Sequence, residues 1–182
     1  MKRICLPLLL LCALLLTGCG SSAAENRYRA FSEELAARDT LYFTARLQAE
    51  YPDKSVTFKL RYALADGDQT VTVVEPDSIA GIRARLLPGE TLLEYDDLIL
   101  DTGNLDKNGL SPMSALPVLV EAMRSGHLDS HWQEGDSPAV KLILADDMSV
   151  TVRFQPDSMT PAYAELLSDS TVTVRCEISD WR

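Results

Sequence analysis

The sequence contains few of the residues that usually bind metal ions or act in catalysis. It has 2 His among 182 residues, and none of its serines lies in the G-x-S-x-G context of a nucleophile elbow. It also lacks a glycine-rich loop of the kind that holds a phosphate group. We therefore expect a protein that is not an enzyme and that has no resident cofactor or metal.

Cysteine is scarce outside the N-terminal segment. Cys5, Cys12 and Cys19 lie close together at the start of the chain, and only Cys176 lies in the remainder. If the first three are removed or modified, no intramolecular disulfide can form, so the domain must rely on a hydrophobic core. Cys176 lies on the apolar side of the alternating segment 172–178, which favours a buried structural thiol over a reactive one.

Basic residues are fewer than acidic ones. The first 18 residues contain two of the 17 Lys and Arg residues and none of the 27 Asp and Glu residues, so residues 19–182 carry a formal charge of −12. Such a surface repels nucleic acid and gains nothing from anionic lipid headgroups. We expect no nucleic-acid partner, and any attachment to a membrane must come from another feature.

Long apolar runs are absent except at the N-terminus. Lys2 and Arg3 precede the almost wholly apolar segment 4–16, which is too short for a stable membrane span and is typical of a signal peptide. Thr17, Gly18 and Cys19 follow it, and this pattern resembles the bacterial lipobox. The resemblance implies cleavage between Gly18 and Cys19. The alternative is an ordinary secretory signal with an incidental cysteine.

The lipobox resemblance also implies a covalent anchor and a location. Cys19 would carry diacylglycerol and, in many bacteria, an additional acyl chain such as palmitate. The protein would then be extracytoplasmic and attached to a membrane. In a cell with one membrane this is the outer leaflet of the plasma membrane. In a cell with two, Gly20 would permit sorting to the outer membrane, since it is not the aspartate associated with retention at the inner one.

After signal residues 1–18, the chain divides into a lipidated tether at 19–26 and a single domain at 27–182. Residues 27–38 have the spacing of an amphipathic helix. Apolar and polar residues then alternate over 41–51 and 56–64, which predicts two half-buried strands. Residues 52–54 and the pair Asp66-Gly67 are expected turns, and 69–74 is a third strand.

The second half of the domain repeats the first. Residues 60–91 and 140–171 align at a shift of 80 without a gap and share 10 identities in 32 positions. Both contain a strand, a turn, a second strand, the tripeptide Pro-Asp-Ser, a segment that ends in Leu-Leu, and a further strand. We interpret them as a duplicated antiparallel meander that forms two halves of one curved sheet.

A helix is expected between the copies. Residues 101–109 are polar and loop-like, Ser114 can cap a helix with Pro117 in its first turn, and Gly126 can end it. Residues 127–138 are expected to form another loop. The apolar stripe of this helix would cover the concave face of the sheet, so we predict an α+β fold built on a large, curved antiparallel sheet that does not close.

Three polar groups are candidate sites. Asn104, Asp106, Asn108 and Gly109 match the first half of an EF-hand loop, but its twelfth position is Ala115, so a polar turn is favoured over calcium. His127 and His131 follow at a spacing of four, without a third ligand. The acidic pairs at 96–97 and 146–147 lie near expected turns, where aspartate is common, rather than in a site for acid–base catalysis.

The remaining candidate is apolar surface between the sheet and the helix. This apolar surface has two interpretations. The first is a filled hydrophobic core, and the second is a cavity that admits an acyl chain or another hydrophobic ligand. The residues that would line such a cavity come from two strands and the helix: Phe43, Leu47, Phe58, Leu60, Tyr62, Leu116, Leu119, Val120 and Met123.

The order of these elements resembles the LolA/LolB lipoprotein-carrier superfamily. The resemblance covers about residues 27–180: the N-terminal helix, the long strands, the segment 75–77, the apolar stretch 82–87, the turn at 88–89 and the segment 93–96. It implies an unclosed antiparallel β-barrel whose helices plug a hydrophobic cavity. The lipid anchor is similar to that of LolB-type proteins and of members from cells with one membrane, including LolA-like spore-germination lipoproteins.

Two functions therefore remain open. The chain could bind a hydrophobic small molecule such as a lipid in a cavity between sheet and helix. Alternatively, it could be a non-enzymatic scaffold that tethers a protein of the cell envelope or the spore cortex to the membrane.

Overall fold

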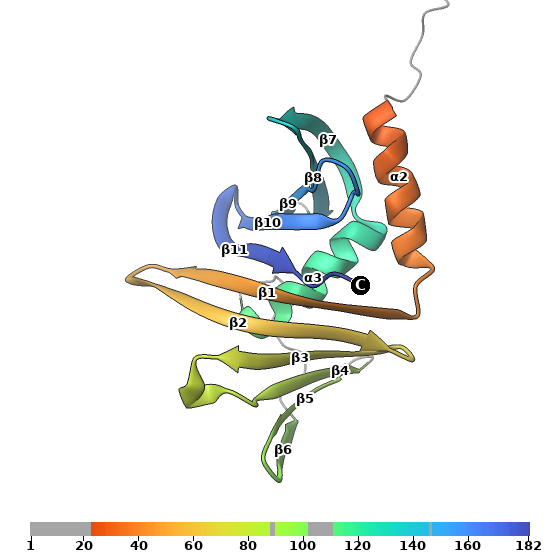
Figure 1. The fold of residues 1–182 in the computed structure, drawn as a ribbon. Helices are drawn as coiled ribbons and strands as arrows, with labels where there is room; N and C mark the ends of the chain where they lie inside the picture. The colour runs from red at the N-terminus through yellow and green to blue at the C-terminus, as the bar shows by residue number, and fades with distance from the viewer. Residues whose placement is uncertain (1–22, 88–89, 102–110, 146) are drawn as a thin grey trace, which may run out of the picture.

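The computed structural model describes residues 23–87, 90–101, 111–145 and 147–182. Within these residues, two α-helices and one short 3₁₀ helix accompany eleven strands, which form a single antiparallel sheet (Figure 1). The helices are α2 (Ala23–Ala36), η1 (Asp77–Ile79) and α3 (Pro112–Ser125). The strands are β1 (Thr40–Tyr51), β2 (Lys54–Ala65), β3 (Asp68–Glu75), β4 (Arg83–Leu87), β5 (Glu90–Tyr95), β6 (Leu98–Asp101), β7 (His127–Glu134), β8 (Ser137–Ala145), β9 (Met148–Phe154), β10 (Pro161–Ser168) and β11 (Thr171–Ser179).

The order of the strands shows that the sheet is not closed. It runs β6-β5-β4-β3-β2-β1-β11-β10-β9-β8-β7, so β6 and β7 lie at opposite edges. The first and last strands of the chain meet in the middle, where β1 pairs with β11. The sheet curves around α3, which lies across its concave face (Figure 1). The predicted α+β fold with an unclosed sheet is therefore confirmed.

The two longest strands form where the sequence alternates most regularly. β1 and β2 pair over their whole length, from Thr40 opposite Ala65 to Tyr51 opposite Lys54. Alternation with a period of two places every second side chain on the buried face, which fixes the register. The expected turn at Asp66 and Gly67 is confirmed: their φ angles are 52° and 86°, a conformation that glycine and aspartate adopt more readily than other residues.

Helix α3 begins earlier than the sequence predicts. Ser111, not Ser114, is its N-cap, and its hydroxyl accepts a hydrogen bond from the Ser114 amide at 3.3 Å. Pro117 therefore lies inside the helix rather than in its first turn, at the expense of one backbone hydrogen bond. The expected end at Gly126 is confirmed. A Cβ at that position would lie 2.5 Å from the carbonyl oxygen of Ala122, so only glycine fits there.

Two predictions of irregular structure are wrong. Residues 23–26, assigned to the tether, form the first turn of α2, where Glu25 pairs with Arg29 one turn later at 2.7 Å. Residues 127–138, predicted as a loop, contain β7 and the start of β8. Most side chains of β7 are exposed on both faces, so its sequence lacks the alternation that marks a half-buried strand.

Several predicted features lie outside the described residues. These are the signal peptide with Gly18 and Cys19, most of the expected loop at 101–109 with its EF-hand-like positions, and the turn at 88–89. Ala115, the twelfth position of the EF-hand-like pattern, is buried in α3. The two segments interpreted as a duplication contain β2–β5 and β8–β11 in the same order, and the duplication itself stays a prediction.

The core fills the space between α3, α2 and the concave face. Phe31 of α2 lies edge-on to Phe154 of β9 at 5.2 Å between ring centroids, and Tyr28 lies 6.1 Å from the same ring. Both contacts join the N-terminal helix to the second half of the sheet. No helix of the described residues is long and apolar enough to cross a membrane.

Candidate functional site

The residues predicted to line a cavity come together between the sheet and α3. Phe43 pairs with Tyr62, and Leu47 pairs with Phe58, across the β1–β2 ladder. Phe58 is partly buried and packs against the core. The other eight side chains are at most 2% exposed: Phe43, Leu47, Leu60, Tyr62, Leu116, Leu119, Val120 and Met123. They therefore form one continuous apolar cluster.

Aromatic rings make up the centre of this cluster. The ring of Phe43 stacks between Tyr62, at 4.9 Å, and Trp181, at 5.0 Å. The Tyr62 hydroxyl donates a hydrogen bond to Oε1 of Gln69 at 2.9 Å, which satisfies its polar end. Burial raises the pKa of Tyr62 far above its ordinary value, so the phenol is uncharged. Tyr62 therefore contributes no charge to this packed aromatic core.

Hydrogen bonds attach α3 to α2 at the C-terminal end of α3. The carbonyl oxygen of Met123 accepts hydrogen bonds from Ser32 Oγ at 2.8 Å and from the Tyr28 hydroxyl at 3.4 Å. The Arg124 guanidinium donates to the carbonyl oxygens of Ala36 and Arg38, both at 3.0 Å. The first turns of α3 instead bury apolar side chains such as Leu116 and Leu119. The C-terminal end of the helix is thus held by hydrogen bonds in addition to apolar contacts.

A set of partly buried apolar residues borders the core on the side of β2–β5. We call these residues the apolar rim: Phe58, Ile82, Leu86, Leu93 and Met113, all of which pack against the core. Leu93 pairs with the buried Ala84 in β4, and Met113 lies in the first turn of α3. The rim is therefore the half-exposed margin of the same apolar cluster.

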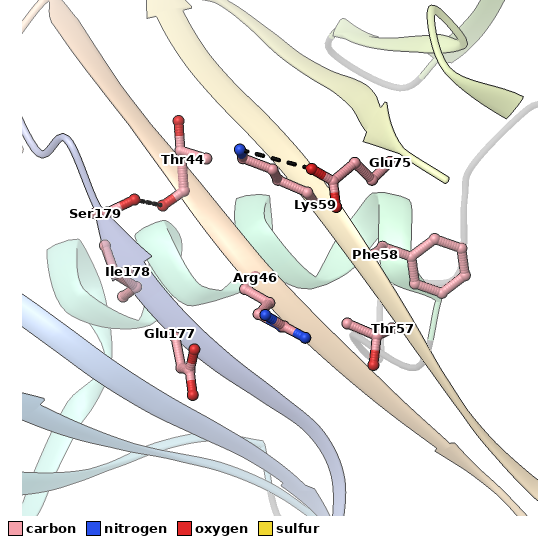
Figure 2. A pocket seen from close by; sticks show the side chains of 9 residues that line it. All are labelled: Thr44, Arg46, Thr57, Phe58, Lys59, Glu75, Glu177, Ile178 and Ser179. Atoms are coloured by element: carbon pink, nitrogen blue, oxygen red, sulfur yellow. Dashed lines mark hydrogen bonds and ion pairs between the residues drawn. The ribbon is translucent and has the colours of Figure 1, made fainter. Parts of the chain in front are cut away.

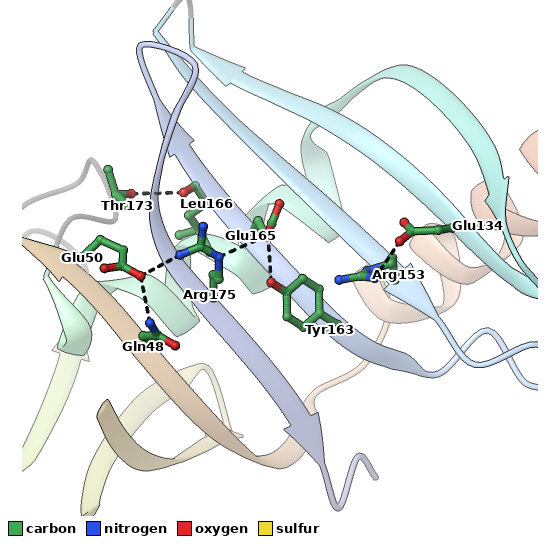
Figure 3. Close-up of polar contacts among 9 residues, drawn as sticks. All are labelled: Gln48, Glu50, Glu134, Arg153, Tyr163, Glu165, Leu166, Thr173 and Arg175. Carbon is green, nitrogen blue, oxygen red and sulfur yellow. Dashed lines mark hydrogen bonds and ion pairs between the residues drawn. The ribbon is translucent and has the colours of Figure 1, made fainter. Parts of the chain in front are cut away.

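The outer face of the sheet is polar. Arg175 of β11 contacts Glu50 of β1 at 2.6 Å and Glu165 of β10 at 3.5 Å (Figure 3). Glu165 accepts a hydrogen bond from the Tyr163 hydroxyl at 2.8 Å, and the Arg153 guanidinium lies 4.0 Å from the Tyr163 ring. Burial, and then the Glu165 carboxylate, raise the pKa of Tyr163. These contacts connect neighbouring strands and need no ligand to satisfy them.

A shallow depression of about 430 Å³ lies on the same outer face across β11, β1, β2 and the end of β3 (Figure 2). Its charged residues alternate in sign: Arg46 pairs in register with Glu177, and Lys59 lies 3.7 Å from Glu75. The balanced charges favour no single class of ligand. We assign no function to this depression.

The other polar candidates that the structure describes form no site, while the EF-hand-like positions and Asp146 lie outside the described residues. Among the described residues, no group of three or more His, Cys, Asp or Glu side chains is arranged to hold a metal ion. His127 and His131 lie exposed on β7, and Asp96 lies in the β5–β6 turn with a φ of 50°. Cys176 is fully buried, as predicted, and burial raises the pKa of its thiol to about 12.

Sequence analysis missed one surface feature, the edge strand β6. Leu98, Ile99 and Leu100 are 66%, 65% and 61% exposed, the largest values among the exposed large apolar residues of the described chain. Three consecutive apolar residues directly after the pair Asp96-Asp97 were the available signal. They show no alternation because neither face of this strand is buried.

Comparison with known proteins gives structural matches only. No protein-family model matches the chain, and a search of curated proteins gives no significant match. An uncharacterized conserved protein from Thermus thermophilus aligns with a TM-score of 0.51 at 8% identity, over 86% of each chain. A domain named as an outer membrane lipoprotein-sorting protein, from Vibrio parahaemolyticus, aligns with a TM-score of 0.50 at 11% identity, over 87% of this chain and 92% of that one.

A third similar structure is a LolA superfamily protein from Nitrosomonas europaea, with a TM-score of 0.47 and 13% identity over 84% of this chain and 92% of that one. The chain shares the fold of the Thermus and Vibrio structures. The unclosed antiparallel sheet with helices that the resemblance to the LolA/LolB superfamily implies is thus confirmed. At these identities the LolA-like fold alone is shared, and the ligand must be argued from the residues of this chain.

Proposed function

We propose that this chain is a lipoprotein, anchored through Cys19 on the extracytoplasmic side of a membrane, that binds the apolar chain of a lipid between its sheet and α3. The anchor is proposed from the lipobox-like pattern at residues 16–19. A tethered domain does not diffuse between membranes, so the protein would receive or hold its ligand at one membrane surface. It would not catalyse a reaction.

The observation that carries the proposal is the apolar rim, which packs against the core and includes Met113 in the first turn of α3. A lipid chain needs an apolar surface that is continuous with the core yet reachable from solvent, and the rim residues are half-buried against that core. Among the described residues, the hydrogen bonds between α3 and α2 lie at the C-terminal end of α3, so a shift of its first turns would cost mainly apolar contacts. The ligand would take over those contacts.

The buried cluster is the inner wall of the proposed site. Leu116 and Leu119 of α3 and Leu60 of β2 are fully buried in the structure, so the space for an acyl chain would open only as α3 moves. Methionine, with its flexible side chain, adapts to irregular apolar ligands, and Met113 and Met123 lie at the two ends of the helix.

Binding of cis-parinaric acid, a fluorescent fatty acid, tests this proposal. We expect saturable binding at one site and an affinity about tenfold lower in Met113→Gln, because a polar group would replace a rim side chain. Tyr51→Ser is the matched control: Tyr51 is 41% exposed at the far end of β1, and the affinity should not change. Absence of saturable binding, or equal losses in both variants, would refute the proposal.

The second candidate function is a scaffold for a protein of the cell envelope. The exposed apolar side chains of β6 favour it, since a monomeric protein seldom leaves such a strand uncovered. A scaffold would bind its partner with the core closed, so Met113→Gln in α3 would leave partner binding intact. The two functions therefore respond to different substitutions.

A further inference from the structure

Strand β6 differs from the usual edge of a sheet. It pairs with β5 on one side and ends the sheet on the other, and its three apolar side chains are each more than 60% exposed. Edge strands in soluble proteins usually carry charges, prolines or bulges that prevent further pairing. The opposite edge follows that rule: β7 is rich in polar side chains and has a bulge between Leu128 and Ser130. The contrast marks β6 as an edge suited to pairing.

The backbone of β6 can accept another strand. In an antiparallel ladder every second residue directs its N–H and C=O groups away from its neighbour. On β6 those groups point out of the sheet, where an added strand would meet them. Side chains alternate as well: Leu98 and Leu100 project from one face and Ile99 from the other. Apolar residues of an added strand would therefore find contacts on both faces.

The charge around β6 indicates what kind of strand would pair with it. Residues 90–101, which form the β5–β6 hairpin, contain five Asp and Glu residues and no Lys or Arg. Among the described residues, the basic side chains that contact it are on β4, where Arg83 and Arg85 lie 3.8 and 3.9 Å from Glu94. Two copies of the hairpin side by side would bring like charges together, and the chain beyond residue 18 carries a charge of −12. Pairing between two copies is therefore disfavoured, and a basic strand is favoured.

We propose that β6 binds an extended segment of a partner protein, in which apolar residues alternate with Lys or Arg, as a twelfth strand of the described sheet. Main-chain hydrogen bonds would supply affinity, and the alternating side chains would supply specificity. The acidic hairpin would also accelerate encounter with a basic segment, an effect that salt weakens. β6 borders the lipid site, since Leu100 pairs with the rim residue Leu93, so the lipid site is probed separately at Met113 of α3.

Two designed peptides test the proposal directly. One has the sequence Lys-Val-Lys-Val-Lys-Val, and its twin has Glu in place of each Lys. The full chain is placed in phosphatidylcholine nanodiscs, with empty nanodiscs as the blank, and binding is followed by fluorescence anisotropy of a labelled peptide. We expect the lysine peptide to bind at least about tenfold more tightly than its twin, and high salt to reduce the difference.

Variants then locate the binding site. Replacement of both apolar side chains on one face, Leu98→Lys with Leu100→Lys, should weaken binding of the lysine peptide about tenfold or more. Trp132→Ser is the control, because Trp132 is 39% exposed on β7 at the other edge of the sheet, and this variant should bind as before. In the unaltered chain, the peptide should slow hydrogen exchange of the β6 amides. This measurement remains valid even if a variant fails to fold.

Three outcomes would overturn the proposal. One is equal affinity for the two peptides, and another is exchange protection that appears elsewhere than on β6. The third is a dimer, seen by sedimentation without peptide, that the double lysine variant abolishes, since a second copy would then be the occupant. Failure of the lipid proposal gives a different result: parinaric acid binding would be absent, or unchanged in Met113→Gln, whatever the two peptides do.

Discussion

Two leucines of this sheet show how widely exposure varies among its apolar residues. Leu47 in β1 is fully buried among the aromatic and aliphatic side chains of the core, whereas Leu98 in β6 is 66% exposed. Both are leucines on strands of the same sheet, so they differ mainly in environment. Removing buried methyl groups costs their transfer free energy and leaves a cavity, while removing exposed ones costs little.

This contrast gives a prediction at the level of single residues. Leu47→Ala should lower the free energy of unfolding by about 2–5 kcal/mol, and Leu98→Ala should change it by no more than about 0.5 kcal/mol. Urea titrations followed by circular dichroism measure both. Equal effects would mean that the sheet does not bury β1 and expose β6 as described.

Among the elements, α3 depends on its attachment to α2. The Arg124 guanidinium bridges the end of α2 and the residue Arg38, which lies between α2 and β1, and Ser32 reaches the last turn of α3. Hydrogen bonds from a charged donor contribute more than neutral ones, although partial exposure weakens them. The C-terminal end of α3 should therefore open more readily when these hydrogen bonds are removed.

We expect Arg124→Gln to destabilise the fold by about 1–2 kcal/mol and to speed hydrogen exchange in the last turns of α3. Arg61→Gln is the matched control, because Arg61 is an exposed residue of β2 on the outer face of the sheet. Exchange rates of the α3 amides in the two variants are the measurement. Unchanged exchange in Arg124→Gln would show that the apolar contacts alone hold the helix.

A strand or helix could be predicted from the sequence when one of its faces is buried and the other is exposed. β1 and β2 were predictable because one face of each is buried and the other is solvated, so their sequences alternate. β7 and β6 were missed because most of their side chains are exposed on both faces, which leaves no period to detect. The start of α3 was misplaced because two serines three residues apart can each serve as an N-cap.

The apolar cluster was predictable in composition but not in its packing. The strand alternation and the helix stripe identify residues such as Phe43 and Leu119 as inward-facing. Whether their side chains leave a space depends on rings far apart in the sequence, as in the stack of Tyr62, Phe43 and Trp181. The sequence alone does not show how rings that are distant in the chain pack against one another, so it does not show whether a cavity remains between them.

For the whole molecule, the central claim is that the LolA-like fold holds one lipid beneath α3 while Cys19 anchors the protein to the membrane. Native mass spectrometry of the full-length protein, purified from bacterial membranes in mild detergent, tests this claim most directly. We predict a mass that includes the acyl groups on Cys19 and one further lipid, which dissociates on collisional activation while the anchor remains. A single species with the mass of the acylated chain and no bound lipid would contradict the claim.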